Sequence, residues 1–374
     1  MSALSSTKQT TNPKKIALGM SGGVDSSLSA HLLIEAGYDV TGVFFDSWEG
    51  ECLAKKDLED AKKVAFQLDI PFKVLDFKKA YKEKVIEYFF KEYQAGRTPN
   101  PDVMCNKEIK FGLFYKWAMK NNFDAVATGH YAKTDGVNLI VPKDKHKDQT
   151  YFLYLLHKEQ LKHVIFPLAN LTKQEVRQEA KKRDIPTAGK KDSVGICFIG
   201  DIDVREFLRE RLGENPGEVV DVDGNVIGQH KGLWFYTIGQ RSGFIIDQKT
   251  LVKQADGSII TKHNIPPFYV IKKIPEKNQL VVGFGAQALI AEFKVSQLHI
   301  INPKHRQLDK LQDLKVRIRH TGKLLDCQIE IDERGKQARV KLNQATRGIA
   351  EGQAAVFYFI EGGETIVIGG GVIS

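Results

Sequence analysis

The sequence predicts an α/β protein: a parallel-sheet domain, then a small β-rich domain and a C-terminal β-barrel. In the first half, short apolar runs alternate with segments whose apolar residues recur at helical spacing. Such alternation is typical of a parallel sheet with helices on both faces. From Pro216 onward, short strand-like runs separated by turn residues dominate. Closely spaced strands of this kind indicate small sheets or a closed barrel.

The first half supplies the strands and helices of the parallel-sheet domain. Apolar runs predict strands over 16–20, 40–45, 72–77 and 125–128. Apolar periodicity predicts helices over 26–36, 58–68, 81–93, 107–120, 150–157, 172–183 and 204–212. Ligands of open parallel sheets bind at the carboxyl ends of the strands. Residues 19–27, Phe45 and residues 129–130 follow three such ends, so we expect them to line one crevice.

From Pro216 onward the predicted elements are strands. A hairpin around an Asp-Gly turn is predicted over 219–227. Further strands are predicted over 269–273, 279–283, 292–298, 314–319, 326–331, 338–342, 354–359 and 365–369. The change in texture predicts three domains, over 1–213, 214–275 and 276–374.

Composition excludes several classes of protein. Of 374 residues, 42% are hydrophobic and 27% charged, which is typical of a folded globular chain. No apolar run approaches the roughly 18 residues that span a membrane, and residues 1–15 lack the apolar core of a secretory signal. We therefore expect a cytoplasmic protein. The four cysteines form no C-x-x-C pair, so neither a metal-binding cluster nor a disulfide framework is predicted.

The net charge of +9 is concentrated in two segments. Residues 173–191 carry seven Lys or Arg, and residues 304–323 carry seven against two Asp. A solvated face explains either segment alone. Two such segments in different parts of the chain fit a polyanionic partner better, and nucleic acid is the obvious one.

The most informative motif is the stretch Gly-Met-Ser-Gly-Gly-Val-Asp-Ser-Ser over 19–27, between a predicted strand and a predicted helix. A helix N-terminus offers unpaired N–H groups and a positive dipole end to an anion. Gly22 and Gly23 allow close approach of the backbone to phosphate oxygens. The loop lacks the Lys of a Walker A motif and the G-x-G-x-x-G spacing of a dinucleotide fold. An ordinary glycine-rich turn is the alternative.

Two cysteines stand in segments that favour chemistry. Cys105 follows Asp102 by three residues, near the predicted start of a helix at Asn106, where the dipole lowers the pKa of a thiol. Cys197 follows the basic pair 190–191, whose positive charge would favour its thiolate. A small buried hydrophobe is the alternative for each, and it is the interpretation we adopt for Cys52 and Cys327.

Ser-Gly-Gly-x-Asp-Ser resembles the loop of the N-type ATP pyrophosphatases, which cleave ATP to AMP and pyrophosphate. Matches over 19–27, 96–112, 128–131, 147–155, 192–200, 237–243, 352–358 and 369–372 cover nearly the whole chain in order. In these segments the chain resembles the tRNA-specific 2-thiouridylases, which thiolate the wobble uridine at position 34.

The resemblance implies roles residue by residue. It implies ATP binding by Gly19, Met20, Ser21, Gly22, Gly23, Val24, Asp25, Ser26, Phe45 and Gly129, with Asp25 holding Mg²⁺. It implies contact with the target base by Asn100, Pro101 and Asp102, the last as acid or base. Cys197 would receive sulfur as a persulfide, and Cys105 would be the partner thiol, forming a transient disulfide with it. Contacts to tRNA are implied for His130, Lys147, Asp148, Gln149, Arg319, His320 and Gln353.

The resemblance also implies partners, and two departures from its pattern affect single contacts. The implied substrates are tRNAs for Lys, Glu and Gln, and the sulfur comes from a relay protein or a cysteine desulfurase.

Phe45 stands where many members carry Met, and His320 where some carry Tyr. The second change leaves that RNA contact open.

Three questions stay open at this point. An amide-forming or lysidine-forming ATP pyrophosphatase would use the same loop without the cysteine pair. A nucleic-acid-binding protein with a vestigial loop would not cleave ATP. Sulfur could attack as the persulfide or as hydrosulfide released from it.

Overall fold

The computed structural model describes residues 14–48, 51–192, 195, 197, 199–200, 202–247, 252–253, 259–260, 267–305, 308, 311 and 313–374. Residues 1–13 of the polar N-terminal segment over 1–15 lie outside this part, as do Arg306 and Lys310 of the second basic segment and the side chain of Cys52. Among the described residues, no helix is long and apolar enough to cross a membrane.

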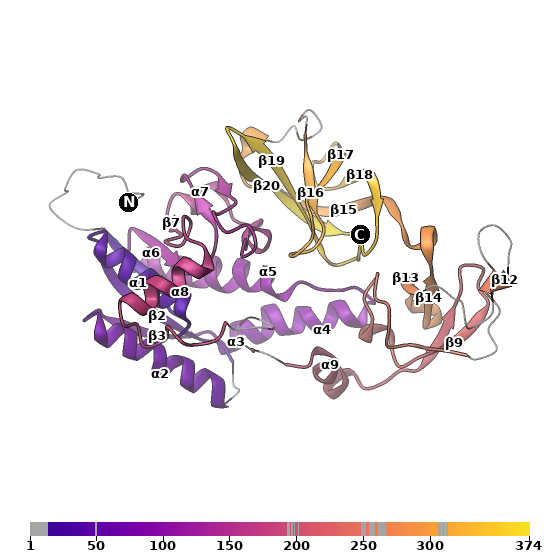
Figure 1. Ribbon diagram of the computed structural model, residues 1–374, viewed down its shortest axis with the longest axis horizontal. Helices are drawn as coiled ribbons and strands as arrows, with labels where there is room; N and C mark the ends of the chain where they lie inside the picture. Colours follow the sequence, from indigo (N-terminus) through magenta and orange to yellow (C-terminus); the bar gives the residue numbers. More distant parts are fainter. Residues whose placement is uncertain are drawn as a thin grey trace.

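The N-terminal unit is the predicted parallel sheet with helices on its faces (Figure 1). Its strand order is β3-β2-β1-β4-β7, all parallel. The strands are β1 (Lys15–Gly19), β2 (Asp39–Asp46), β3 (Phe72–Asp76), β4 (Ala125–Thr128) and β7 (Val164–Ile165). The chain order reverses direction between β1 and β4. A ligand crevice is expected at such a switch point.

Helices α1 (Val24–Glu35) and α8 (Lys173–Lys182) pack together on one face of this sheet. Leu28 and Leu33 of α1 and Val176 and Ala180 of α8 are buried in one hydrophobic cluster. Further helices are α2 (Glu51–Gln67), α7 (Lys158–Leu161) and α9 (Val204–Leu212). Of the helix predicted over 150–157, only a 3₁₀ turn forms, Thr150–Leu153. His157 is already the N-cap of the next helix, α7.

Two predicted helices are longer than expected and contain π-helical segments. The first consists of α3 (Lys78–Tyr81), a π-helical stretch (Lys82–Ile86) and α4 (Glu87–Gln94). The second consists of α5 (Pro101–Cys105), a π-helical stretch (Asn106–Phe114) and α6 (Tyr115–Lys120). π-helical insertions are frequent at functional sites.

The predicted start of the second helix near Asn106 is wrong. Asn100 is the N-cap, its side chain accepting a hydrogen bond from Val103 N at 3.3 Å, and Pro101 occupies the first turn. An Asn cap followed by proline is a strong helix start. Cys105 is therefore inside the helix and fully buried.

The central unit is a second sheet of order β10-β9-β8-β14-β13. It contains β8 (Gly217–Val220), β9 (Val226–His230), β10 (Ile245–Ile246), β13 (Tyr269–Ile274) and β14 (Gln279–Gly283), with a separate pair of β11 (Val252–Lys253) and β12 (Ile259–Ile260). Short 3₁₀ turns cover Leu233–Phe235, Pro275–Lys277, Gly285–Ala288 and Pro303–His305. The predicted boundary at 275 falls inside the β13–β14 hairpin. We propose a division after Gly283 instead.

The C-terminal unit is a closed antiparallel barrel, in which the pairing of β15 with β20 completes the circle. Its strands are β15 (Ile290–Ile300), β16 (Lys315–Arg317), β17 (Leu325–Ile331), β18 (Ala338–Thr346), β19 (Ala354–Glu361) and β20 (Glu364–Ile373). Two short strands of the N-terminal unit, β5 (Lys133–Thr134) and β6 (Leu139–Ile140), extend the barrel sheet beside β20.

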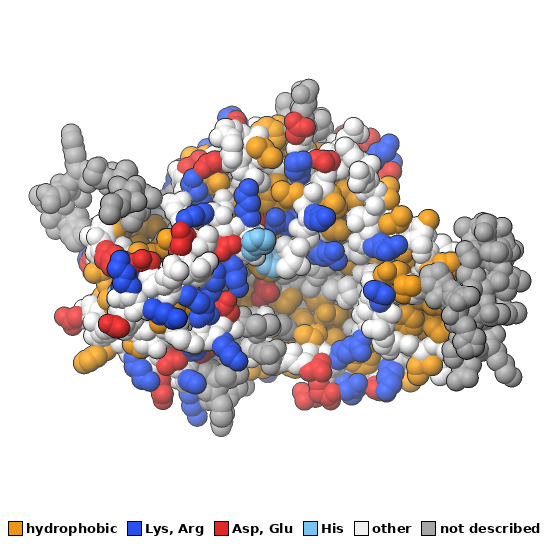
Figure 2. All heavy atoms as spheres, in the orientation of Figure 1, with side chains coloured by type: hydrophobic (Ala, Val, Ile, Leu, Met, Phe, Trp, Pro, Cys, Tyr) orange, Lys and Arg blue, Asp and Glu red, His pale blue; other side chains and the backbone are white. Residues whose placement is uncertain are grey.

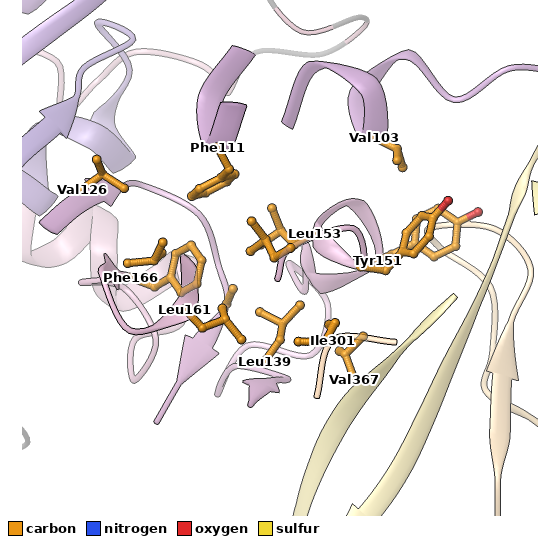
Figure 3. Close-up of a cluster of buried hydrophobic side chains, with 14 of the residues drawn as sticks. Val103, Phe111, Val126, Leu139, Tyr151, Leu153, Leu161, Phe166, Ile301 and Val367 are labelled. Atoms are coloured by element: carbon orange, nitrogen blue, oxygen red, sulfur yellow. The ribbon is translucent and has the colours of Figure 1, made fainter. Parts of the chain in front are cut away.

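A shared hydrophobic core joins the barrel to the N-terminal unit (Figure 3). Leu139 pairs in register with Val367, and Ile301 belongs to the same cluster. Tyr151 donates a hydrogen bond to the Ala354 carbonyl at 2.9 Å. Burial of this apolar surface fixes the barrel on the unit that carries the predicted catalytic residues.

A buried ion pair crosses the same boundary. Arg317 donates to Asp148 at 2.7 Å, and their side chains are 12% and 1% exposed. The Arg317 guanidinium also lies over the Tyr358 ring at 5.0 Å. Asp148 accepts further hydrogen bonds from the Thr150 N–H and hydroxyl.

We expect Arg317→Met to lower the free energy of unfolding by about 3 kcal/mol, because it leaves the Asp148 carboxylate buried without its cation. Urea denaturation followed by circular dichroism measures the loss. Adding Asp148→Asn should restore part of it. Unchanged unfolding of Arg317→Met would show that the ion pair contributes nothing.

Candidate active site

The loop after β1 forms a cradle at the N-terminus of α1. Gly23 is the N-cap of this helix and makes no side-chain capping hydrogen bond. The first N–H groups of an α-helix have no partner within it, so they are available to an anion. The loop is shaped from within: Ser26 Oγ accepts from Ser21 N at 3.2 Å, and Ser27 Oγ donates to the Gly23 carbonyl at 2.8 Å.

Two glycines hold this loop in place through close backbone approach. Gly22 has φ +71°, and a Cβ there would lie 2.2 Å from the Asp57 carbonyl oxygen. At the end of β4, a Cβ on Gly129 would lie 2.8 Å from Ser26 N. The carboxyl ends of β1 and β4 thus meet at the loop. This close packing accounts for a glycine at position 129.

Other residues predicted to bind ATP face the core. Met20 and Val24 are buried. Phe45 is 7% exposed and packs against Phe77 and Phe114 at ring distances of 5.7 and 4.7 Å. Its ring also lies 3.1 Å from where a Cβ on Gly19 would stand. A contact of Phe45 to a nucleotide is therefore limited to its backbone.

Asp25 lies at the cradle and is already engaged by protein groups. Its carboxylate accepts from Lys173 Nζ at 2.7 and 2.8 Å and from the Tyr131 hydroxyl at 2.9 Å. The neighbouring carboxylate raises the pKa of Tyr131 in addition to burial. Among the described residues, no cluster of three His, Cys, Asp or Glu could hold a metal. One carboxylate beside a phosphate-binding loop suits Mg²⁺, which takes most ligands from phosphates and water.

A chain of ion pairs ties the segment before Cys197 to the cradle. Lys190 donates to the Gly22 carbonyl at 3.0 Å and to Asp57 and Asp60 at 2.7 Å. Asp192 accepts from Lys147 at 2.9 Å, and ion pairs with Lys173 and Arg177 add to this. Despite the cost of burial, these cations hold the pKa of Asp192 well below its usual range. Much of the positive charge predicted to meet RNA over 173–191 is neutralised in this way.

The second half of the site is a thiol pair, in which Cys105 is buried and Cys197 is half-buried. Asp102 Oδ1 accepts from Cys197 N at 3.1 Å, and the Tyr81 hydroxyl donates to the Cys197 carbonyl. The side chains of Cys197 and Cys105 are hydrogen-bonded to each other, and both thiols are free. Cys105 and Cys197, which are 92 positions apart in the chain, are therefore in contact. The side chains of Asp102 and Tyr81 hold the backbone of Cys197 in this position.

The two thiols differ in acidity. The hydrogen bond from Cys105 and the charge of Lys110 lower the pKa of Cys197 to about 7. Burial raises the pKa of Cys105 well above its usual range. The prediction that the helix N-terminus acidifies Cys105 is wrong, because Cys105 ends α5 rather than preceding it. The prediction that residues 190–191 acidify Cys197 is also wrong for Lys190, which pairs with Asp57 and Asp60.

Asp102 has the character of an acid or base. Burial raises the pKa of its carboxyl, against the hydrogen bond from Cys197 and the charge of Lys110. A carboxyl with a raised pKa holds a proton more readily than an exposed one, which suits proton transfer.

Lys110 and Tyr81 are site residues that sequence reasoning missed. Lys110 is hydrogen-bonded to Cys197 and lies 3.4 Å from His130 Nε2. Burial and this cation keep the pKa of His130 well below its usual range. His130 Nδ1 lies 2.8 Å from Thr128 Oγ1. The signal for Lys110 was its position eight residues after Asp102, which places it on the same helix face.

The loop before α5 is held by all three units. Gln353 of the barrel donates to the carbonyls of Thr98 and Pro99 at 3.1 and 2.8 Å. Thr98 Oγ1 also donates to Thr237 Oγ1 of the central unit at 3.3 Å. Gln353 thus positions the segment that contains Asn100 and Pro101.

Of the remaining residues predicted to contact tRNA, some are packed inside the protein and others are exposed. Asp148 is internal, and Gln149 accepts from Tyr131 N at 2.9 Å. The His320 ring packs on Phe152 at 4.3 Å. Arg319 and Lys147 are exposed.

Arg319 lines a cavity of about 400 Å³ between the central sheet and the barrel. Its other lining residues are Ile238, Gly239, Tyr269, Leu289, Ala345, Thr346, Arg347 and Gly348. Arg347 and Arg241 lie over the Tyr269 ring at 4.6 and 5.7 Å. Lys and Arg side chains are spread over one face of the N-terminal unit and the barrel (Figure 2).

The families that match this chain divide it into three parts, as the structure does. Residues 14–201 match the family described as the tRNA methyl transferase HUP domain. Residues 205–284 match the tRNA methyl transferase PRC-barrel domain, and residues 290–373 the aminomethyltransferase beta-barrel domain. The tRNA-specific 2-thiouridylase MnmA of Lactobacillus johnsonii is 44% identical over 367 residues, covering 94% of this chain and 95% of its own. The chain belongs to the tRNA-specific 2-thiouridylase family.

A second 2-thiouridylase, from Streptococcus thermophilus, is 43% identical over 378 residues, covering 97% of this chain and 96% of its own. Among solved structures, an NMN synthetase from Francisella tularensis matches with a TM-score of 0.34 and 22% identity, covering 52% of this chain and 72% of that one. A TM-score this low carries no argument. The 2-thiouridylase family membership rests on the sequence relatives.

Proposed function

We propose that this protein replaces the C2 oxygen of the wobble uridine of tRNA by sulfur, at the expense of ATP. The observation that carries the proposal is the juxtaposition of Cys105, Cys197 and Asp102 on the sheet unit that bears the anion cradle. Family membership supports it. An amide-forming ATP pyrophosphatase would need the cradle but no thiol pair.

The first step activates the base. The C2 oxygen attacks the α-phosphorus of ATP, its bond to phosphorus forms, and pyrophosphate leaves. The α1 N-terminus and the Ser21–Ser26 loop bind the phosphates. Mg²⁺ bound with ATP would neutralise phosphate charge, and Asp25 is the residue that would hold it. Asp25 must then exchange its Lys173 contact for the metal.

The second step delivers sulfur. The terminal sulfur of a Cys197 persulfide attacks C2, and the bond from C2 to the activated oxygen breaks, so that AMP leaves with that oxygen. The Cys105 sulfur then attacks Cys197 Sγ, and 2-thiouridine is released as the Cys105–Cys197 disulfide forms. The two cysteines are oxidised by two electrons, and an external dithiol or thiol reductant restores them. A cysteine desulfurase or a relay protein would supply the persulfide sulfur.

The base must leave its stack to reach this centre. We propose that Asn100 and Pro101 line the base pocket and that Asp102 moves a proton at the uracil. His130 touches Lys110 and borders the same centre. The implied tRNAs for Lys, Glu and Gln are part of this proposal.

The cavity between the central sheet and the barrel is our candidate for tRNA contact away from the reacting base. Tyr269 offers an aromatic face flanked by two guanidinium groups, a combination that suits nucleobases and phosphates. Arg319 lies on its rim.

We expect Arg347→Ala to weaken tRNA binding about fivefold and to reduce the slope of log Kd against log salt by about one, because one cation that meets RNA is lost. Filter binding at several salt concentrations measures both. Arg334→Ala, in the turn before β18 and at the opposite end of that strand from Arg347, is the control. Equal effects of the two changes would exclude this surface.

The decisive test is mass spectrometry of nucleosides from tRNA incubated with the protein, ATP, Mg²⁺ and a persulfide source. We expect 2-thiouridine at position 34, together with AMP and pyrophosphate. Formation of AMP and pyrophosphate without 2-thiouridine would favour another ATP pyrophosphatase. Binding of tRNA without ATP cleavage would favour a vestigial loop.

A further inference from the structure

Lys110, a half-buried lysine of the thiol centre, takes no part in the reaction steps proposed above. Lys110 lies in the π-helical stretch after α5, on the face that carries Asp102 and Cys105. Burying an ammonium is costly unless anions or hydrogen bonds compensate. A lysine in such a place therefore needs an anionic partner.

The groups around Lys110 identify that partner. Its side chain is hydrogen-bonded to Cys197, and Cys105 and Asp102 lie close enough to raise its pKa against the effect of burial. On its other side is His130, at 3.4 Å from Nζ to Nε2. Burial keeps His130 neutral, so this imidazole presents a nitrogen lone pair rather than a charge.

Cys197 is the anion that fits best. The carboxylate of Asp102 is already committed to Cys197 N through Oδ1. Cys105 donates its S–H to Cys197 rather than ionising itself. Tyr81, which holds the Cys197 carbonyl, stays neutral because burial raises its pKa.

We propose that Lys110 is a thiolate-stabilising residue, which pairs with Cys197 Sγ and keeps it anionic, ready to accept sulfur. The sulfur-accepting role rests on the proposed function. The ion pair itself does not, because it concerns only the ionisation of one thiol. The proton of Cys197 leaves to solvent or Asp102, and no electron is transferred in this step.

The pair also explains how one centre holds two thiols with different tasks. A thiolate accepts sulfur, whereas the resolving thiol must stay protonated until the persulfide has reacted. The hydrogen bond from Cys105 and the positive charge of Lys110 both stabilise a negative charge on Cys197. Without the lysine, burial would favour the neutral form of both thiols.

The test measures the rate of alkylation of Cys197 by iodoacetamide between pH 5 and 10, read by mass spectrometry of the Cys197 peptide in the full-length protein. We expect the parent protein to show a midpoint near 7. Lys110→Met should move the midpoint upward by about one pKa unit. Alkylation at pH 7 should then slow about fivefold, because the thiolate fraction falls from about one half to about one tenth. Lys110→Arg, which keeps the charge, should restore part of the rate.

Asp102→Asn provides a second variant that leaves Lys110 in place. Its amide oxygen still accepts from Cys197 N, while the carboxylate that opposes ionisation is gone. We expect its midpoint to move downward. Unchanged midpoints in folded Lys110→Met and Asp102→Asn would overturn the proposal. A shifted Lys110→Met midpoint in a protein that makes no 2-thiouridine would refute the proposed function alone.

Discussion

Cys197→Ser should abolish formation of 2-thiouridine while leaving tRNA binding and thermal stability close to those of the parent protein. A serine hydroxyl has nearly the size of a thiol, so the anchors from Asp102 and Tyr81 to the backbone of residue 197 persist. It cannot carry a persulfide, because sulfur transfer requires a sulfur acceptor. Nucleoside mass spectrometry measures the product.

The barrel supplies a matched control for this substitution. Cys327 is buried, and its sulfur donates to the Leu314 carbonyl at 3.7 Å, far in sequence from the thiol centre. We expect Cys327→Ser to retain activity, with a modest loss of stability. Undiminished 2-thiouridine from Cys197→Ser would eliminate persulfide chemistry at this residue.

Gly22→Ala should reduce ATP cleavage about a hundredfold or more. A Cβ there would lie 2.2 Å from the Asp57 carbonyl oxygen, so the loop must move. Displacing a positioning element by about 1 Å can cost two orders of magnitude in rate. Release of pyrophosphate in the presence of tRNA measures the effect.

Gly37→Ala separates this clash from the general cost of a left-handed backbone. Gly37 has φ +82°, close to the +71° of Gly22, but nothing lies within 4 Å of its Cβ position. The left-handed backbone by itself should cost each variant about 1 kcal/mol of stability. Equal ATP cleavage by the two variants would contradict the proposed role of the loop.

The sequence alone predicted the parallel sheet and the loop after its first strand. Strands β1, β2, β3 and β4 lie within one or two residues of their predicted ranges. Local signals are sufficient here, because buried parallel strands read as apolar runs and end at small polar residues. The barrel strands, which are antiparallel, were predictable from short strand-like runs separated by turn residues.

Local sequence patterns did not predict the start of an irregular helix, or the pairing of a strand with a strand of another unit. The start of α5 depends on a cap from Asn100 that the spacing of apolar residues does not show. The pairing of β6 with β20 depends on contacts between residues more than 200 positions apart. Such pairings carry no periodicity of their own.

The sequence by itself determined the sheet, the anion loop and, through the segments that resemble a family, the pair Cys105 and Cys197. Only the tertiary structure decided which thiol ionises. It buries Cys105 inside a helix and brings Lys110 against Cys197. The acidity of a thiol is set by burial and by neighbouring charges, and in this fold those neighbours come from residues distant in the sequence.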